Sequence, residues 1–321
     1  MLLTFYRFIN NTHEKVILNS DKKVAILAIS IVIPLTAFSL WLSEQNKAES
    51  MSVSGHRVLV TFYPLYQFTK SVGKDKIDVS IIIPPGIEPH DWEPTIQDIE
   101  KMKDADMIVI NGAGLESWIT KITSVNPNVM IVDTSNGVPL LEKNSNGLDK
   151  TAKDPHIWLD PVLAKKQVQN IANGLIKLDP QNANYYQQNA NNYNTKLAAF
   201  DNKIKTDLAV CSKKDFLAFH DAFSYFSKEY DLHQHTIVGG LDPETEPTAP
   251  ALQQITKDAQ SLGLNVIFTE EAANPRVSQV IADEIHGKVM VLSPLEVTDK
   301  NIDYISKMEQ NLSNLKEALC P

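Results

Sequence analysis

The sequence predicts an α/β fold of two lobes, each a series of alternating strands and helices, joined by one long helix. Short segments rich in Val and Ile alternate with segments of helical spacing over residues 57–133 and again over 215–319. Such alternation is typical of parallel βαβ units. Between the two series, residues 180–209 carry apolar side chains at steps of three and four, the pattern of one amphipathic helix.

The first series begins with short apolar strands that end at turn signals such as Pro84-Pro85-Gly86. The predicted strands are 57–62, 77–83, 107–111 and 129–133, and the predicted helices are 65–73, 95–103 and 115–123. Residues 141–153 are polar and predict a surface loop. Asp160-Pro161 then predicts the start of a helix that runs to about Lys177, because Asp is a favoured N-cap and Pro a favoured first helical residue.

The second series has the same organisation and closes with a helix. The predicted strands are 215–219, 234–238, 265–269 and 288–292, and the predicted helices are 222–230, 248–262, 275–286 and 301–319. In parallel sheets, ligands gather at the carboxyl ends of the strands. The residues that follow each strand are therefore the candidates for a binding site.

An uncharged apolar segment, residues 24–42, precedes both series and is just long enough to cross a bilayer. Lys22 and Lys23 place residues 1–23 in the cytoplasm and the rest of the chain outside. A cleaved signal peptide is the alternative, but the apolar run is longer than is usual there and no small-x-small site follows closely. No cysteine lies near the end of this segment, so a lipid-anchored N-terminus is excluded. The polar residues 43–55 are interpreted as a tether.

Composition argues against a nucleic-acid partner, since the chain of 321 residues has a net charge of −9 and no basic patch. Its two cysteines, Cys211 and Cys320, can pair if the chain is exported into an oxidising space. Such a bridge would attach the last helix to the second lobe. The alternative is two unrelated thiols.

Three histidines share an unusual local frame of prolines or carboxylates. His90 lies in PHDWEP (89–94), His156 in DPHIWLDP (154–161) and His220 in FHDAF (219–223). They are 66 and 64 residues apart, and each is expected on a stiff loop or at a strand end. The sequence therefore predicts one site assembled from distant parts of the chain.

Imidazole nitrogens suit zinc and related transition metals, and each ligating histidine needs an acceptor for its other ring nitrogen. We expect Asp91, Asp160 and Asp221 to supply these acceptors, and Trp92 and Trp158 to line the pocket. The remaining histidines lack the frame and are interpreted as ordinary surface or core residues: His13, His56, His233, His235 and His286.

From about residue 56 to 321 the chain resembles the solute-binding proteins that serve zinc and manganese ABC transporters. The motifs that carry the resemblance are TFYPLY (61–66), PHDWEP, DPHIWLDP, DPQNANYYQQNANNY (179–193), FHDAF, GLDPETEPT (240–248), FTEEAANP (268–275) and VLSPLE (291–296).

The resemblance implies two Rossmann-like lobes, 56–178 and 210–321, joined by a rigid helix over 179–209, with the metal in the cleft between them. It implies that His90, His156, His220 and Glu270 bind Zn²⁺, with Glu270 at the end of the FTE run. Because side chains alternate along a strand, Glu271 should point the other way, and we expect it to be a solvated or capping carboxylate. Mn²⁺ is the alternative ion. The implied protein is no enzyme but an extracytoplasmic monomer that delivers the metal to an ABC permease.

Two other functions remain open. A metallohydrolase would use three histidines, an open water position and Glu270 as base, although the sequence has no HExxH motif. An adhesion or scaffold protein would use the metal only structurally.

Overall fold

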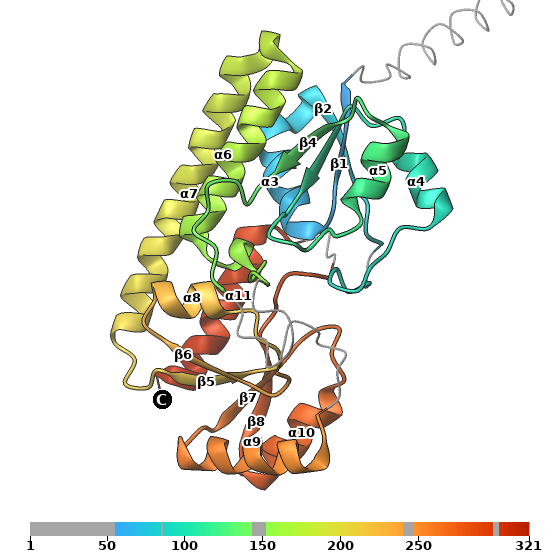
Figure 1. Ribbon diagram of the computed structural model, residues 1–321. Coiled ribbons are helices and arrows are strands. Elements are labelled where there is room, and N and C mark those ends of the chain that lie inside the picture. Colours follow the sequence, from blue (N-terminus) through green and yellow to red (C-terminus); the bar gives the residue numbers. More distant parts are fainter. Residues whose placement is uncertain (1–54, 85, 143–151, 240–246, 298–301, 321) are drawn as a thin grey trace, which may run out of the picture. The chain divides into compact units, whose positions relative to one another are not determined.

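Two four-stranded parallel sheets form the framework of the protein. The computed structural model describes residues 55–84, 86–142, 152–239, 247–297 and 302–320 (Figure 1). The first sheet has the order β2-β1-β3-β4 and the second the order β6-β5-β7-β8. The strands are β1 His56–Val60, β2 Ile77–Ile81, β3 Met107–Ile110, β4 Met130–Asp133, β5 Asp215–Ala218, β6 His233–Thr236, β7 Val266–Thr269 and β8 Lys288–Val291. The two series of strands and helices predicted from the sequence are thus present, with the same lateral order in each lobe.

Helices cover both faces of each sheet. In the first lobe they are α3 Tyr63–Gly73, α4 Ile96–Met102, α5 Ile119–Val125 and α6 Pro161–Leu178. In the second lobe they are α8 Ser224–Glu229, α9 Ala249–Ser261, α10 Pro275–Glu284 and α11 Tyr304–Leu319, while α7 Ala183–Ala209 connects the lobes. Several begin at side-chain caps, such as the capping box of Thr95 and Asp98 on α4 and the Asp160 cap on α6, which receives the Val162 N–H.

Strand residues alternate between two apolar cores, because successive side chains in a strand point to opposite faces. On β1, Val58 and Val60 pack with α3 and α6, whereas Leu59 packs with Trp118 and the other residues under α4 and α5. The second sheet repeats this arrangement, with Phe216 on one face and Leu217 on the other.

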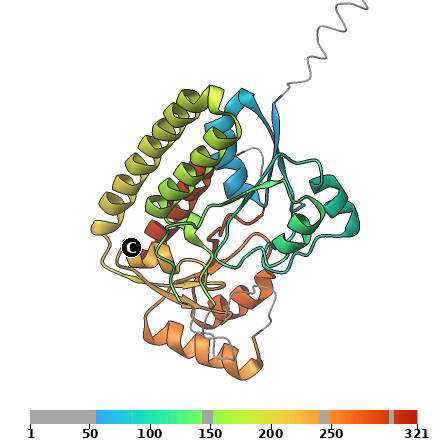
Figure 2. The same cartoon turned by 45° about the horizontal axis from the view of Figure 1, so that its top comes forward.

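One core is continuous from the first lobe to the second. It contains residues of both sheets together with one face of α7 and of α11, and α7 runs along both lobes (Figures 1 and 2). The ring of Tyr304, at the start of α11, lies 4.8 Å from that of Phe68 on α3. Gly55–Pro321 accordingly form one compact unit.

A disulfide joins Cys211, just after α7, to Cys320, just after α11. It attaches the last helix to the second lobe, as the sequence suggested. Among the described residues, no helix has both the length and the apolar character needed to span a bilayer. The predicted anchor over 24–42 lies outside the described residues.

The helix predicted over 115–123 begins later, at Ile119. The preceding residues are fixed instead by the buried carboxylate of Glu116, which accepts hydrogen bonds from the backbone N–H groups of Asn111 and Gly112. Gly112, in the turn after β3, has a φ of 80°, a conformation that glycine adopts readily.

Candidate metal centre

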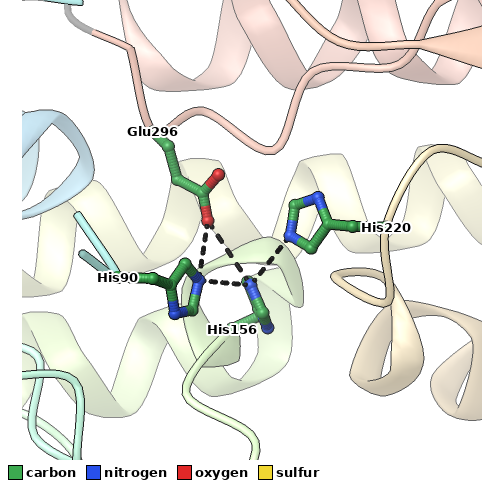
Figure 3. Close-up of side chains that lie close together, drawn as sticks. All are labelled: His90, His156, His220 and Glu296. Carbon is green, nitrogen blue, oxygen red and sulfur yellow. Dashed lines mark hydrogen bonds and ion pairs between the residues drawn. The ribbon is translucent and has the colours of Figure 1, made fainter. Parts of the chain in front are cut away.

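The site lies where the carboxyl ends of the two sheets face each other. His90 follows β2 and His156 follows β4 in the first lobe; His220 follows β5 and Glu296 follows β8 in the second. This is the place that the strand-end rule indicates for parallel sheets. The three predicted histidines are therefore brought together (Figure 3).

Four potential ligand atoms converge in this site. Nε2 of His156 lies 3.1 Å from Nε2 of His90 and 3.2 Å from Nε2 of His220. Oε1 of Glu296 lies 3.4 Å from Nε2 of both His90 and His156. All four atoms lie within 4.8 Å of one another, and the side chains of His156, His220 and Glu296 are buried. Figure 3 shows the Glu296 carboxylate directed at the imidazoles.

Two carboxylates fix the orientation of two of the rings. Asp154 Oδ1 accepts from both the backbone N–H and Nδ1 of His156, at 3.0 and 2.7 Å. Glu270 Oε1 does the same for His220, at 3.2 and 2.7 Å. Because a carboxylate only accepts, each Nδ1 carries the hydrogen, and in the neutral ring Nε2 presents a lone pair.

Lone pairs about 3 Å apart repel one another, so a cation is required between them. A metal ion or a proton can play this role. Two histidines with Nδ1–H hydrogen-bonded to a carboxylate and Nε2 directed into a common space are what metal ligation needs.

The electrostatics favour cations in the site. Burial lowers the pKa of His220, but the carboxylates of Glu270 and Glu296 outweigh it and raise this pKa to about 9. Burial also lowers the pKa of His156. The carboxylate of Asp154 outweighs burial there, and the net shift of this pKa is upward. Burial raises the pKa of Glu296, yet the facing imidazoles of His156 and His90 outweigh burial, and the net shift is downward. Glu296 is therefore ionised.

Other groups near the site are less charged. Burial lowers the pKa of His90, the one histidine at the rim. Burial and the nearby Glu296 carboxylate raise the pKa of Glu88 to about 9, so Glu88 is a neutral acid at pH 7. Its Oε1 accepts the His90 N–H at 3.3 Å, which steadies the loop that carries His90.

The structure differs from the sequence prediction at the fourth position. Glu270 contacts Nδ1 of His220, on the opposite side of the ring from Nε2, and so is no member of the converging set. Glu296 takes that place. It ends the VLSPLE motif just beyond β8, so the same strand-end signal that selected Glu270 was available for it.

The expected acceptors for the histidines are also corrected. Asp160 caps α6 through Val162 N, Asp221 receives hydrogen bonds from Ser224 and Gln234, and Asp91 is exposed. Asp154 and Glu270 are the acceptors instead. Asp154 lies two residues before His156. From that position, its short side chain can reach both the backbone N–H and the ring of His156.

Three further residues for which the sequence predicted a position are Glu271, Trp158 and Trp92. Glu271 is exposed and pairs with Lys307 at 3.1 Å, in agreement with the expectation that it points away from the site. Trp158 is fully buried, with its ring 5.2 Å from that of His156, whereas Trp92 packs on Trp118 at 5.0 Å.

The spacing of the four atoms fits zinc. A Zn–N distance of about 2.0–2.1 Å gives a tetrahedron whose edges are about 3.3–3.4 Å. Four of the six separations, 3.1, 3.2 and twice 3.4 Å, are close to these edges, and all four atoms lie within 4.8 Å of one another. Two α/β lobes with a buried set of metal-type ligands between them define a metal-binding solute-binding protein.

Comparison with known proteins identifies the family. A profile of the family described as zinc-uptake complex component A, periplasmic (ZnuA) matches residues 58–318, and the chain belongs to this family. It is 39% identical over 293 residues to the high-affinity zinc uptake system protein ZnuA of Bacillus subtilis (strain 168), covering 86% of this chain and 91% of that protein.

Two further relatives come from streptococci. The chain is 32% identical over 320 residues to the zinc-binding protein AdcA of Streptococcus pyogenes, covering 92% of this chain and 61% of AdcA. The crystal structure of the Zn(II)-bound ZnuA-like domain of Streptococcus pneumoniae AdcA matches with a TM-score of 0.73 at 31% identity, covering 84% of this chain and 100% of that chain. The family, the two-lobed fold and the zinc-binding function inferred from the sequence are thereby confirmed.

Proposed function

We propose that the chain captures Zn²⁺ outside the cytoplasm with Nε2 of His90, His156 and His220 and the carboxylate of Glu296, and passes it to an ABC permease. The segment 24–42 would hold the protein at the membrane surface, with 43–55 as a tether. Family membership supports the transport role, and the positive charge before the apolar segment supports this orientation.

One observation carries the proposal: three imidazole nitrogens and one carboxylate oxygen converge in a buried site, all within 4.8 Å of one another. Four protein donors would close the coordination shell. A catalytic zinc site keeps one position open for water, so this donor set favours holding an ion over hydrolysis.

The donor set also favours Zn²⁺ over Mn²⁺. Imidazole suits zinc, whereas carboxylate, carbonyl and water ligands at octahedral positions suit manganese. Here three of the four donors are nitrogens and only Glu296 supplies oxygen. The single carboxylate offsets part of the charge of the ion.

The test is metal binding by the full-length chain and its variants, measured by competition with a chelator and by metal analysis. We expect one Zn²⁺ per chain, which excess Mn²⁺ displaces poorly. His156→Ala and Glu296→Gln should each weaken zinc binding strongly. Glu271→Gln is the matched control, because it changes an exposed glutamate outside the site.

Wild-type zinc affinity in both His156→Ala and Glu296→Gln would exclude this ligand set. Equal affinity for Mn²⁺ and Zn²⁺ would exclude the choice of zinc. Turnover of a hydrolysable substrate by the zinc-loaded protein would favour the hydrolase instead.

A further inference from the structure

The fourth ligand is aimed by its backbone and not by hydrogen bonds to its carboxylate. Glu296 is only 3% exposed, yet within the described part of the chain no backbone N–H or hydroxyl donates to either of its oxygens. Its carboxylate faces Nε2 of His90 and Nε2 of His156, each at 3.4 Å. In contrast, the rings of His156 and His220 are each locked by a carboxylate on Nδ1.

The turn Ser293–Glu296 is therefore what places the carboxylate. The side chain of Asn311 on α11 makes two hydrogen bonds to the backbone of Ser293. Ser293 N–H donates to Asn311 Oδ1 at 2.8 Å, and Asn311 Nδ2 donates to Ser293 O at 2.7 Å. Leu295, directly before Glu296, is fully buried and has a φ of 61°. A leucine disfavours this left-handed conformation and keeps it only where surrounding contacts impose it.

Trp158 supplies a contact to the same turn from the other lobe. Its indole N–H donates to the carbonyl of Pro294 at 2.7 Å. Trp158 itself is fully buried, packs edge-on against Phe62 at 4.7 Å, and its carbonyl accepts the Tyr304 hydroxyl at 2.6 Å. It lies two residues after His156, so one short segment holds a histidine ligand and the anchor of the glutamate turn.

We propose that Trp158 is a positioning residue for the fourth ligand: its N–H on Pro294 holds the turn that directs Glu296 at the imidazoles. The inference rests on the proposed function, since it concerns the same site. Without this hydrogen bond, Leu295 is free to leave its left-handed conformation, and the carboxylate withdraws. Zinc is then held by three histidines with water in the fourth place.

The test is a double-mutant cycle in the full-length chain, with Trp158→Phe and Glu296→Gln made singly and together. Chelator competition measures zinc affinity, and the visible absorption of bound Co²⁺ reports the coordination shell. Trp158→Phe keeps an aromatic ring but removes the N–H, and we expect about a 10-fold loss of zinc affinity, as for other groups that orient a ligand.

The decisive expectation is non-additivity, because Trp158 acts only through Glu296. In the Glu296→Gln background, Trp158→Phe should cause no further loss, and the two single variants should show the same Co²⁺ spectrum. Trp118→Phe is the matched control: it truncates another fully buried tryptophan, whose N–H lacks a partner within the described residues, and should leave zinc affinity unchanged.

An equal loss of affinity from Trp158→Phe in both backgrounds would overturn the proposal and assign Trp158 to support of His156. Wild-type affinity in Trp158→Phe would overturn it as well. If Trp158→Phe does not fold, the same cycle is run with Asn311→Ala, which loosens the turn from α11, and additivity there overturns the proposal. If Glu296→Gln alone has wild-type affinity, the proposed ligand set fails instead, which separates the two conclusions.

Discussion

Zinc and protons compete for the same nitrogens, and the structure predicts how strongly pH controls zinc affinity. Zinc needs the lone pair on Nε2 of each imidazole, so a protonated ring must first lose its proton. Glu270 and Glu296 raise the pKa of His220 to about 9 against the effect of burial. In the metal-free protein at pH 7, one proton therefore lies on His220, where it can be shared with Nε2 of His156 at 3.2 Å.

The magnitude follows from linkage. Displacement of one proton lowers the observed affinity about tenfold for each pH unit below the pKa of the group. Between pH 9 and pH 7, His220 alone should therefore reduce zinc affinity about 50-fold. The raised pKa of His156 adds to the slope, whereas His90, whose pKa burial lowers, contributes nothing until lower pH. The pH window is thus higher than the reference pKa of imidazole, about 6.5, would suggest.

The stability of the metal-free protein should change in the opposite direction to zinc affinity: it should fall as pH rises, whereas zinc affinity should increase. A pKa raised on folding stabilises the protein fully below the unfolded value and ceases to do so as pH rises through the folded value. The metal-free protein should therefore lose stability between about pH 6.5 and pH 9 because of His220. The zinc-bound protein, which lacks this proton, should not show this loss.

The assay is chelator competition from pH 6 to pH 9 at constant ionic strength, with calorimetry in buffers of different ionisation enthalpy to count the protons released. Glu270→Gln removes the carboxylate that raises the pKa of His220, so its affinity should depend less on pH between 7 and 9. A wild-type affinity that stays flat over this interval, with no proton release at pH 7.5, would refute the reasoning.

Further predictions concern stability and the individual ligands. Replacing Cys211 and Cys320 by alanine should lower the free energy of unfolding by about 4–5 kcal/mol, because the disulfide closes a loop of 109 residues; denaturant titration checks this, and an unchanged midpoint would contradict it. His156→Ala should lower zinc affinity by orders of magnitude without unfolding the protein. His235→Ala, which removes a partner of Asp215 outside the site, should leave zinc affinity unchanged. Chelator competition measures the affinity, and circular dichroism checks that each variant is folded. Thr95→Ala removes the capping box of α4 and should cost about 1 kcal/mol of stability at unchanged zinc affinity; an effect on zinc binding would show that α4 influences the site.

The sequence predicts the elements well because their signals are local. Val-rich and Ile-rich strands, the Thr95 cap and the Asp160-Pro161 helix start all depend on neighbouring residues. The three histidines were also accessible, because the rule that ligands follow the strands of a parallel sheet needs only the strand boundaries. His220 lies just after β5, whereas His90 and His156 lie in longer loops, where the neighbouring prolines and carboxylates were the signal.

Which carboxylate joins the three histidines depends on the lateral order of the strands, which local sequence signals do not reveal. β7 pairs directly with β5, so Glu270 at the end of β7 reaches the Nδ1 side of His220. β8 lies at the sheet edge, and the turn after it crosses to the first lobe, where Trp158 receives it. Two carboxylates with the same local signal thus take different roles, and only their neighbours in space distinguish them.

The position of α11 in the chain has a consequence for synthesis. This helix is the last one described, yet Tyr304 packs against Phe68 of the first lobe and Leu312 and Leu315 fill the core that both sheets share. A growing polypeptide therefore leaves a large apolar face of each lobe uncovered until its final residues have emerged. The apolar core that both lobes share can therefore be completed only after α11 has been translated.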